Sequence, residues 1–305
     1  MYHMIVNPSS KSGFGMRKWK ELKSLFLKKM VTYNVQFTSG PMDTYKCIRK
    51  LTGGSFTLPL KIVVLGGDGT LNEVLNGIQD FENTVLTFLP TGSSNDLARD
   101  LKRTSDPEEL LEHLSDSSPF EMDFGAVRYK GGKRRFIVSS GIGFDAAVCE
   151  ESLHSTLKKV LNLFRLGKLT YGMIALKLLI QAKPVSCDLW LDDSDTPIHF
   201  DRMLFCAAMN HKYEGGGFMF SPEADDADGY LDICLAANLS KWRVPFLLPL
   251  AMKGKHVGKQ GIYNYRAKKI RIKTSSPLPV HTDGEICGHF DSLELTCEEK
   301  KLKFL

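Results

Sequence analysis

Lys61-Ile62-Val63-Val64-Leu65 runs directly into Gly66-Gly67-Asp68-Gly69-Thr70, and this stretch decides the fold. The short apolar, β-branched run is typical of a buried strand, and the glycines after it indicate a tight turn. Residues 71–78 have helical spacing, so the sequence predicts a strand, a glycine loop and a helix in succession. Because glycine has no side chain and a helix N-terminus is electropositive, such a loop can bring bare backbone N–H groups against a phosphate.

The acid in this loop, Asp68, is a second indication. A carboxylate beside a bound phosphate is repulsive unless a divalent cation or a transferable proton lies between them. The loop therefore predicts phosphate chemistry with Mg²⁺ rather than anion binding alone. For the loop taken by itself, the plainer interpretation also stays open, in which Asp68 caps the helix after a tight turn.

Three further strand–loop units accompany this one in the first part of the chain. Each has a short apolar strand followed by a loop of small residues, at 4–6 and 7–13, at 33–37 and 38–41, and at 84–89 and 90–96. Repeated units of this kind predict a parallel sheet with helices on both faces. The loops that follow the strands then meet at one sheet edge, where α/β proteins bind their ligands, so we expect the cleft there.

The pattern changes after the polar segment 115–119. Strand-like runs then recur up to residue 297, with a β-hairpin at 123–139 and one helical stretch at 160–182 between them. We expect an α/β domain over residues 1–118 and a mainly antiparallel β-domain, a sandwich, over residues 119–297. Whether residues 298–305 return to the first domain is left open.

Composition limits the function. The net charge of +5 over 305 residues is too mild for a nucleic-acid-binding protein, so no nucleic acid partner is expected. The seven cysteines are scattered without a CxxC pair, as in a reduced cytoplasmic protein, and the eight histidines form no HExxH-type zinc pair. No apolar run reaches the ~18–20 residues of a membrane span, so we expect a soluble protein or one that rests on a membrane surface.

A series of motifs follows in order along nearly the whole chain. They are Asn7-Pro8, GGDGT at 66–70, NEVLNG at 72–77, PTGSSNDLAR at 90–99, GIGFDA at 141–146, KLTYG at 168–172, GGG at 215–217, DGYLD at 228–232 and DGE at 283–285. Together they resemble the diacylglycerol kinase catalytic-domain family, and most closely its soluble bacterial lipid kinases, which are related to sphingosine and ceramide kinases. The resemblance implies a nucleotide-binding domain at 1–118, like that of NAD kinase and diacylglycerol kinase, and a lipid-substrate domain at 119–297.

The resemblance also implies roles for individual residues. ATP would be bound by Asn7, Pro8, Ser9, Ser10, Lys11, Thr38, Gly66, Gly67, Asp68, Gly69, Thr70, Leu71, Asn72, Glu73, Ser93, Asn95 and Asp96. Asp68 would organise Mg²⁺ and the attacking hydroxyl through water. Glu285 would be the general base that takes the proton from a lipid hydroxyl, with Asp283 assisting. An alcohol needs a carboxylate within hydrogen-bond reach, and the transferred phosphoryl group needs positive charge around it.

Plainer alternatives exist for some of these residues. Asn95 and Asp96 at a helix start are also explained by N-capping, and DGE at 283–285 by a β-turn with exposed acids. The sequence departs from the family at two places. Ser93 stands where threonine is usual, which keeps the hydroxyl, and Lys11 stands near a usual glycine, which would alter the phosphate or ribose contacts.

An acid-dense segment at 222–229 ends in glycine, as oxygen-ligand metal loops do. By resemblance, a structural Mg²⁺ would be held here by Asp228 together with the backbone carbonyls of Asp225 and Tyr230. A solvated acidic turn is the alternative.

The segment 233–282 contains ten basic residues and no acidic one. Apolar residues between 242 and 250 accompany them, and basic residues beside an apolar face suit an anionic membrane surface. A core helix followed by solvated strands explains the segment equally well, and Pro245 and Pro249 argue against a long amphipathic helix. A lipid pocket is likewise weighed against core packing for Phe164, Leu169, Tyr171, Ile174, Leu178, Leu179 and Ile180.

These features predict an ATP- and Mg²⁺-dependent kinase of a lipid hydroxyl. Diacylglycerol, converted to phosphatidic acid in phospholipid biosynthesis, is the first choice of substrate. The protein would be cytoplasmic and peripheral at the inner membrane face, and a homodimer is left open. The alternatives are an NAD kinase-like small-molecule kinase, disfavoured by Asn95-Asp96 and the DGE motif, and a non-catalytic nucleotide- or lipid-binding sensor, disfavoured by the presence of Asp68 and Glu285.

Overall fold

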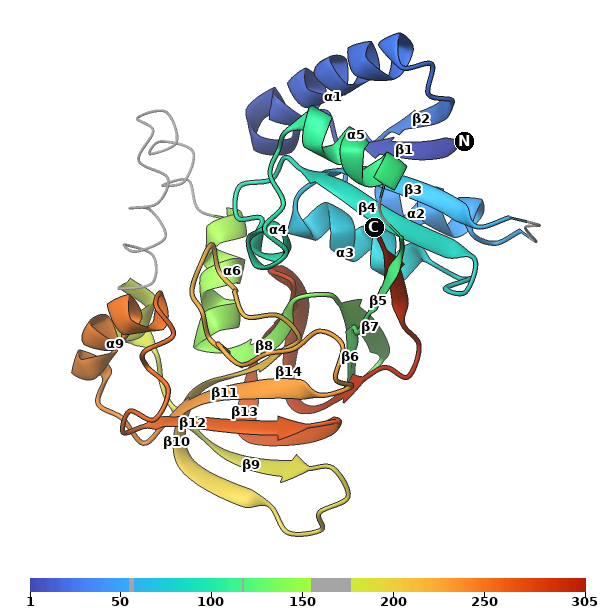
Figure 1. Cartoon of the computed structure of the whole chain (residues 1–305). Coiled ribbons are helices and arrows are strands. Elements are labelled where there is room, and N and C mark those ends of the chain that lie inside the picture. The colour runs from blue at the N-terminus through green and yellow to red at the C-terminus, as the bar shows by residue number, and fades with distance from the viewer. Residues whose placement is uncertain (55–57, 117, 155–176) are drawn as a thin grey trace.

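The computed structural model describes residues 1–54, 58–116, 118–154 and 177–305. In these residues the chain forms an α/β domain followed by a β-rich domain, with the last strand back in the first domain (Figure 1). The expected fold class, a parallel α/β domain followed by an antiparallel β-sandwich-like domain, is thereby confirmed. The helical stretch expected at 160–182 and the motif at 168–172 fall largely outside the described residues. So do Phe164, Leu169, Tyr171 and Ile174 of the expected lipid pocket.

The first domain contains a six-stranded sheet in the order β2-β1-β3-β4-β15-β5. Its strands are β1 Tyr2–Val6, β2 Tyr33–Phe37, β3 Leu60–Gly66, β4 Thr84–Pro90, β5 Phe120–Met122 and β15 Leu302–Phe304. The first four and β15 are parallel, and β5 is antiparallel to β15. The chain end thus fills a place between β4 and β5, far from its position in the sequence.

Helices cover both faces of this sheet (Figure 1). They are α1 Ser10–Lys28, α2 Asp43–Leu51, α3 Asp68–Gly77, α4 Asp96–Asp100 and α5 Pro107–Asp116. Because side chains alternate along a strand, Val63 and Leu65 face α1 and α5, while Ile62 and Val64 face α2 and α3. The second of these cores also contains Phe124, Ile137 and Val138 from the β-rich domain, so the two domains share buried apolar surface.

The second domain is built around a nine-stranded, mainly antiparallel sheet. Its strands are β6 Gly125–Tyr129, β7 Gly132–Phe136, β8 Ser139–Gly143, β9 Val185–Leu191, β10 Ile198–Met209, β11 Leu231–Ala237, β12 Ile262–Ala267, β13 Lys269–Thr282 and β14 Glu285–Cys297. Its helical elements are α6 Phe144–His154, the 3₁₀ turn η1 Lys241–Arg243 and α9 Val244–Ala251. The hairpin expected at 123–139 is present as β6 and β7, but Ser139 already belongs to the next strand, β8.

The long strands β13 and β14 matter most for the site. They pair over most of their length and are joined by the turn that contains Asp283 and Gly284. The turn emerges at the side of the sheet that faces the first domain, where Asp283 accepts hydrogen bonds from α3 and from the β7–β8 connection. No helix in the described residues is long and apolar enough to cross a membrane.

Candidate active site

Of the four loops expected at the carboxyl edge of the first sheet, the three that follow β1, β3 and β4 are joined by hydrogen bonds. The Asn7 amide donates to the Thr70 hydroxyl at 3.2 Å, and the Ser10 and Thr91 hydroxyls lie 2.7 Å apart. Backbone bonds join the same loops, since Asn7 N–H donates to the Leu65 carbonyl and Thr91 N–H to that of Gly66. The loops that begin at residues 7, 66 and 91 therefore form one polar surface at the N-terminus of α3.

Glycine is required where two of these loops cross. A methyl group added at Gly67 would come within 2.8 Å of the Gly92 Cα, and one added at Gly92 within 2.5 Å of the Gly67 Cα. Contacts this close between backbones exclude any larger residue at either position. The first N–H groups of α3, from Asp68 onward, have no partner within the helix and point out of its N-terminus. This arrangement suits phosphate oxygens.

The loop after β1 has an unusual backbone. Lys11, Ser12 and Gly13 follow one another with φ of 42°, 55° and 86°. Left-handed conformations cost little for glycine but about 1 kcal/mol for other residues. The structure therefore places Lys11 in a conformation that glycine would adopt more easily.

Asp68 caps the neighbouring helix α4. Its carboxylate accepts the backbone N–H groups of Asp96 at 3.1 Å and of Leu97 at 3.4 Å. Desolvation and the nearby carboxylates of Asp96 and Asp283 nevertheless raise the pKa of Asp68 to about 7. A carboxylate uses only part of its acceptor capacity on two N–H groups. Within the described residues Asp68 has no ion-pair partner, and an acid crowded by two other carboxylates fits a divalent cation.

Asn95 and Asp96 have different surroundings. Asn95 adopts a left-handed conformation with φ of 52°, donates to the Gly92 carbonyl, and leaves its Oδ1 buried without a hydrogen-bond partner. The Asp96 carboxylate is buried, pairs with Arg99 and accepts the Gly216 N–H at 2.8 Å. Asp96 thus connects the first domain to the glycine-rich loop at 215–217 of the second.

Glu285 reaches the glycine loop from the second domain. It begins β14, and a methyl group added at Gly69 would come within 2.6 Å of Glu285 Oε1. Desolvation raises the pKa of Glu285, Arg134 opposes this rise, and Glu73 and Asp283 add to it. The acid proposed as the base therefore lies directly beside the loop proposed to bind phosphate, across the domain boundary.

Asp283 is held on both oxygens. Its carboxylate accepts the N–H groups of Ile137, Val138 and Ser139 at 2.8–3.1 Å and the Asn72 amide at 2.8 Å. Its own backbone N–H donates to the Ser139 carbonyl at 2.9 Å. These bonds fasten the turn that precedes Glu285 to the β7–β8 connection and to α3.

Arg134 is a site residue that our sequence reasoning missed. Its guanidinium donates twice to Asn72 Oδ1, at 3.0 and 2.8 Å, and it opposes the rise in the pKa of Glu285. The Asn72 side-chain amide therefore accepts from Arg134 and donates to the Arg135 carbonyl and to Asp283. The run Lys133-Arg134-Arg135 in a hairpin was the available signal, but it looks like an ordinary solvated strand.

A second group behind the turn is formed by His281, Asp145 and Glu214. The Gly284 N–H donates to His281 Nδ1 at 3.1 Å, so the imidazole proton lies on Nε2, which is 3.3 Å from a carboxylate oxygen of each acid. A metal on Nε2 would require the proton on Nδ1 instead, where the Gly284 N–H already points. The hydrogen bonding therefore indicates that this buried group supports the turn structurally and is not a metal centre.

Four other expected nucleotide residues lie outside the loop cluster or at its margin. Leu71 is buried in the core, and the Glu73 carboxylate accepts the N–H groups of Met42 and Tyr45 at the start of α2. Thr38 closes β2 through bonds to the Val6 carbonyl, whereas Ser93 is exposed in its loop. The structure brings together the loops at 7–10, 66–70 and 91–96 with Glu285, and it assigns Asn72 and Asp283 to the joint between the domains.

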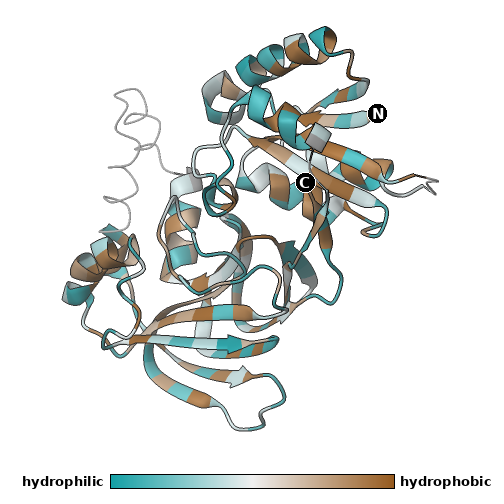
Figure 2. Cartoon of the chain, in the orientation of Figure 1, coloured by the Kyte–Doolittle hydropathy of each residue, from teal (hydrophilic) through white to brown (hydrophobic). Residues whose placement is uncertain are grey.

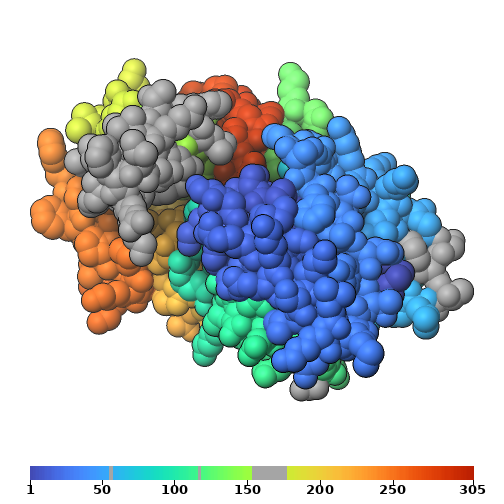
Figure 3. Space-filling model, turned by 90° about the horizontal axis from the view of Figure 1, so that it is seen from above, coloured from blue at the N-terminus to red at the C-terminus, as the bar shows by residue number. Residues whose placement is uncertain are grey.

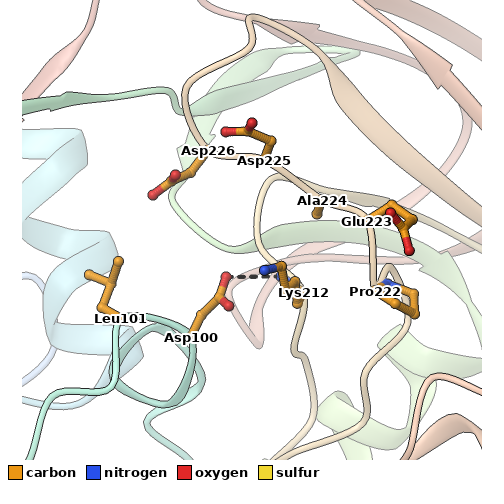
Figure 4. Close-up of a pocket in the computed structure, with 8 residues that line it drawn as sticks. All are labelled: Asp100, Leu101, Lys212, Pro222, Glu223, Ala224, Asp225 and Asp226. Atoms are coloured by element: carbon orange, nitrogen blue, oxygen red, sulfur yellow. Dashed lines mark hydrogen bonds between the residues drawn. The ribbon is translucent and has the colours of Figure 1, made fainter.

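The acidic segment expected to hold a structural Mg²⁺ borders a cavity of about 450 Å³ (Figure 4). Asp225 and Asp226 line this cavity opposite Asp100 and Lys212. Asp228 is engaged elsewhere, because its Oδ1 accepts the Tyr230 N–H at 2.9 Å and its Oδ2 lies 3.1 Å from the Arg266 guanidinium. A carboxylate already paired with a cation does not fit the role of chief metal ligand, so the metal assignment to Asp228, Asp225 and Tyr230 stays a prediction.

Two family models match the two domains of this chain. Residues 1–127 match the model of the diacylglycerol kinase catalytic domain, and residues 137–303 match that of the YegS C-terminal NAD kinase beta sandwich-like domain. A Bacillus subtilis (strain 168) protein named "Putative lipid kinase YtlR" is 29% identical over 298 residues, which are 94% of this chain and 94% of that protein. A diacylglycerol kinase of Staphylococcus epidermidis (strain ATCC 35984) is 25% identical over 239 residues, 78% of this chain and 72% of the relative.

Two solved structures share the fold. A diacylglycerol kinase from Bacillus anthracis str. Sterne has a TM-score of 0.70 at 20% identity, covering 99% of this chain and 95% of that one. An NAD kinase from Archaeoglobus fulgidus in complex with ATP has a TM-score of 0.54 at 13% identity, covering 100% and 93%. At these identities the likeness concerns the fold alone.

Proposed function

This chain belongs to the lipid-kinase family that combines a diacylglycerol kinase catalytic domain with a YegS C-terminal NAD kinase β-sandwich-like domain, and we propose that it transfers the γ-phosphoryl group of ATP to the free hydroxyl of diacylglycerol. The observation that carries the proposal is the position of Glu285 Oε1 against Gly69 of the GGDGT loop. Glu285, a proton acceptor from the second domain, would then lie next to the terminal phosphate of an ATP molecule bound by the first domain.

The proposed reaction uses the residues of this site as follows. The loops at 7–10, 66–70 and 91–95 bind the ATP phosphates through backbone N–H groups and hydroxyls, and the N-terminus of α3 faces the negative charge. Ionised Glu285 accepts the proton of the lipid hydroxyl while the hydroxyl oxygen attacks the γ-phosphorus and ADP leaves. Arg134 favours the ionised form of Glu285 and adds positive charge near the transferred group. Asp283 positions the turn and takes no proton.

Mg²⁺ would be held at Asp68, a half-buried acid whose pKa is raised by desolvation and by neighbouring carboxylates. When bound, the ion would neutralise phosphate charge and polarise the bond to the leaving group. The free thiols of all seven cysteines support a reducing, cytoplasmic setting. We place the enzyme at the inner membrane face, where it would supply phosphatidic acid to phospholipid synthesis.

Replacing Glu285 with Gln tests the assignment. The amide keeps the size of the side chain but cannot accept the proton, so we expect ATP binding to persist while turnover falls about 10²–10⁴-fold. ATP affinity is measured by calorimetry, and turnover with radiolabelled ATP on micelles of diacylglycerol, phosphatidylglycerol, a prenol and a sphingoid base, with NAD⁺ as a soluble acceptor.

Glu299→Gln, an exposed carboxylate outside the site, is the matched control and should retain full activity. Normal turnover by the Glu285 variant would remove Glu285 from the mechanism. Label transferred to NAD⁺ rather than to any lipid would replace the lipid kinase with an NAD kinase-like enzyme, and label in another lipid would change the substrate alone.

A further inference from the structure

The segment from η1 to Lys259 carries apolar side chains that face away from the protein. Trp242 is 80% exposed, Phe246 78%, Met252 55% and Val257 43%. We call this segment, residues 241–259, the apolar tip. It lies at an outer edge of the second domain, orange in Figure 3, and Figure 2 shows a mixture of brown apolar and teal hydrophilic residues there.

The part of the tip formed by α9 packs on the β-rich domain. Val244 and Ala251 are buried, and Leu247 and Leu248 pack with Val244 on the core that contains Phe205 and Leu239. Val244, Leu247, Leu248 and Ala251 have the i, i+3, i+4, i+7 spacing of one helix face. Trp242 and Phe246, one turn apart, therefore lie on the opposite face and are held outward by a well-packed helix.

The charged residues within the tip itself are all basic. Arg243, Lys253, Lys255 and Lys259 are exposed, and within the described parts of the chain none of them lies within 4 Å of a carboxylate. Arg243 donates to the Gln260 side chain at 2.8 Å.

Some of the basic residues that follow in the sequence are paired. Arg266 pairs with Asp228 and Asp232, and Lys269 pairs with Glu294. Within the described residues Lys268, Arg271 and Lys273 form no ion pair, so the unpaired cations of the segment 233–282 lie both at the apolar tip and near the start of β13.

We propose that the apolar tip docks on the anionic surface of a phospholipid bilayer. Trp242 and Phe246 enter the boundary between headgroups and acyl chains, while Arg243, Lys253, Lys255 and Lys259 contact the lipid phosphates. The inference rests on the proposed function, because an enzyme whose substrate lies in a bilayer must reach it. A second copy of the chain is a poor occupant, since a two-fold contact would bring the same cations together.

Vesicle binding tests this without any turnover. Purified protein is sedimented with vesicles of phosphatidylcholine alone and of phosphatidylcholine with 30% phosphatidylglycerol, in the absence of ATP. We expect binding to the anionic vesicles that weakens with salt and little binding to the neutral ones. Trp242 is far more exposed than the buried Trp19, so its emission should shift to the blue on binding, and Trp242→Phe should remove the shift.

Two variants separate the contributions. Trp242→Ala with Phe246→Ala should weaken binding at least tenfold, and Lys253→Glu, Lys255→Glu and Lys259→Glu together about a hundredfold. The matched control reverses Lys23, Lys28 and Lys29, which are exposed on α1, and it changes the net charge equally. If the control and the tip variants lose vesicle binding to the same extent, the protein is attracted to the vesicles by its net charge alone, and the proposal fails. It also fails if wild type does not bind, or if Trp242 emission shifts only when the protein dimerises.

The result is independent of the proposed function, because sedimentation needs neither ATP nor a substrate. If the protein also phosphorylates diacylglycerol, the tip variants should lose activity on vesicles but keep it on a short-chain diacylglycerol dissolved as monomers. Equal loss on both substrates would show that the tip supports the fold or the active site rather than docking.

Discussion

The two carboxylates of the DGE turn have opposite surroundings although they are two residues apart. Asp283 accepts four hydrogen bonds from N–H groups, whereas within the described residues the Glu285 carboxylate accepts none and faces Gly69. Desolvation raises the pKa of both carboxyls, and the hydrogen bonds to Asp283 oppose that rise. The bonded carboxylate orients the chain, and the one with free acceptor capacity can take a proton. The expected assistance of Asp283 to the base is therefore best understood as positioning.

Replacement of Asp283 with Asn should destabilise the protein and impair turnover together. Asparagine has one acceptor oxygen, and its NH₂ group would point its two hydrogens at N–H groups that now donate to the carboxylate. We therefore expect a loss of about 3 kcal/mol in the free energy of unfolding. Urea denaturation measures the loss. Asp291→Asn, an exposed carboxylate in the same strand β14, should stay within about 0.5 kcal/mol of wild type. Equal stability of the two variants would contradict the positioning role.

Asp68 should make stability depend on pH in the absence of metal. Its pKa is raised from 3.8 to about 7, so the folded protein keeps a proton between about pH 4 and 7 that the unfolded chain has released. Its contribution to stability therefore falls as pH rises through this window. In EDTA, Asp68→Asn should equal wild type below pH 4 and become progressively more stable than wild type up to pH 7.

Magnesium should reverse this difference. If Asp68 holds the ion, Mg²⁺ at pH 8 should raise the melting temperature of wild type and leave that of Asp68→Asn unchanged. The measurement is thermal unfolding with and without Mg²⁺. Equal stabilisation of both proteins would place the ion elsewhere.

At the scale of elements, α3 joins the two domains. Its N-terminus carries the glycine loop, and its other end is held by β7. Arg135 donates to the carbonyls of Leu75 and Ile78 at 3.4 and 3.2 Å, and its guanidinium lies 4.9 Å from the centre of the Phe81 ring. A cation at a helix C-terminus satisfies carbonyls that lack helical partners.

Arg135→Met should therefore loosen the C-terminal end of α3. We expect a loss of about 1–2 kcal/mol in the free energy of unfolding from the carbonyl bonds and the ring contact. ATP affinity should fall several-fold, because the phosphate loop moves with the helix. Urea denaturation and calorimetry with ATP measure these effects. Arg128→Met, an exposed arginine on the adjacent β6, is the control, and the role of Arg135 is contradicted if both variants behave alike.

At the scale of the whole molecule, β15 ties the end of the chain to the beginning. Phe304 is fully buried and packs against Phe88 and Phe120, with ring centres 5.7 and 5.9 Å apart. Lys301 pairs with the buried Asp123 where the chain passes between the domains, and Asp123 also accepts the Gly229 N–H at 2.7 Å. The domains also share an apolar core, so we expect them to unfold as one unit.

Phe304→Ala tests this coupling. Removing a fully buried phenylalanine should cost about 3–5 kcal/mol, and calorimetry should still show one transition, at a lower temperature. Phe120→Ala in the neighbouring strand removes a ring that is 40% exposed and should cost distinctly less. Two separate transitions in the Phe304 variant would mean that the domains are independent.

Much of the fold could be predicted from the sequence because it depends on local patterns. The apolar runs at 61–65 and 84–89, each followed by a loop of small residues, specify strands that end at a common edge. The proposal that Glu285 is the base came from the resemblance of the DGE motif, since three residues in a turn carry no physical signal of their own. Glu73 and Leu71 show the limit of carrying residue roles over from a family. The Glu73 side chain caps α2, and that of Leu71 lies in the core.

The sequence by itself determined the glycine loop, because a strand, two adjacent glycines and a helix start lie within ten or so residues and need no distant partner. Only the tertiary structure decided how Glu285, the proposed base, meets it. Asn72 and Asp283 are 211 residues apart, and their contact depends on the register of β13 with β14 and on the place of β7 in the same sheet. No local pattern encodes that register, so the roles of Asp283, Arg134 and Glu285 became distinct only when the two domains were packed together.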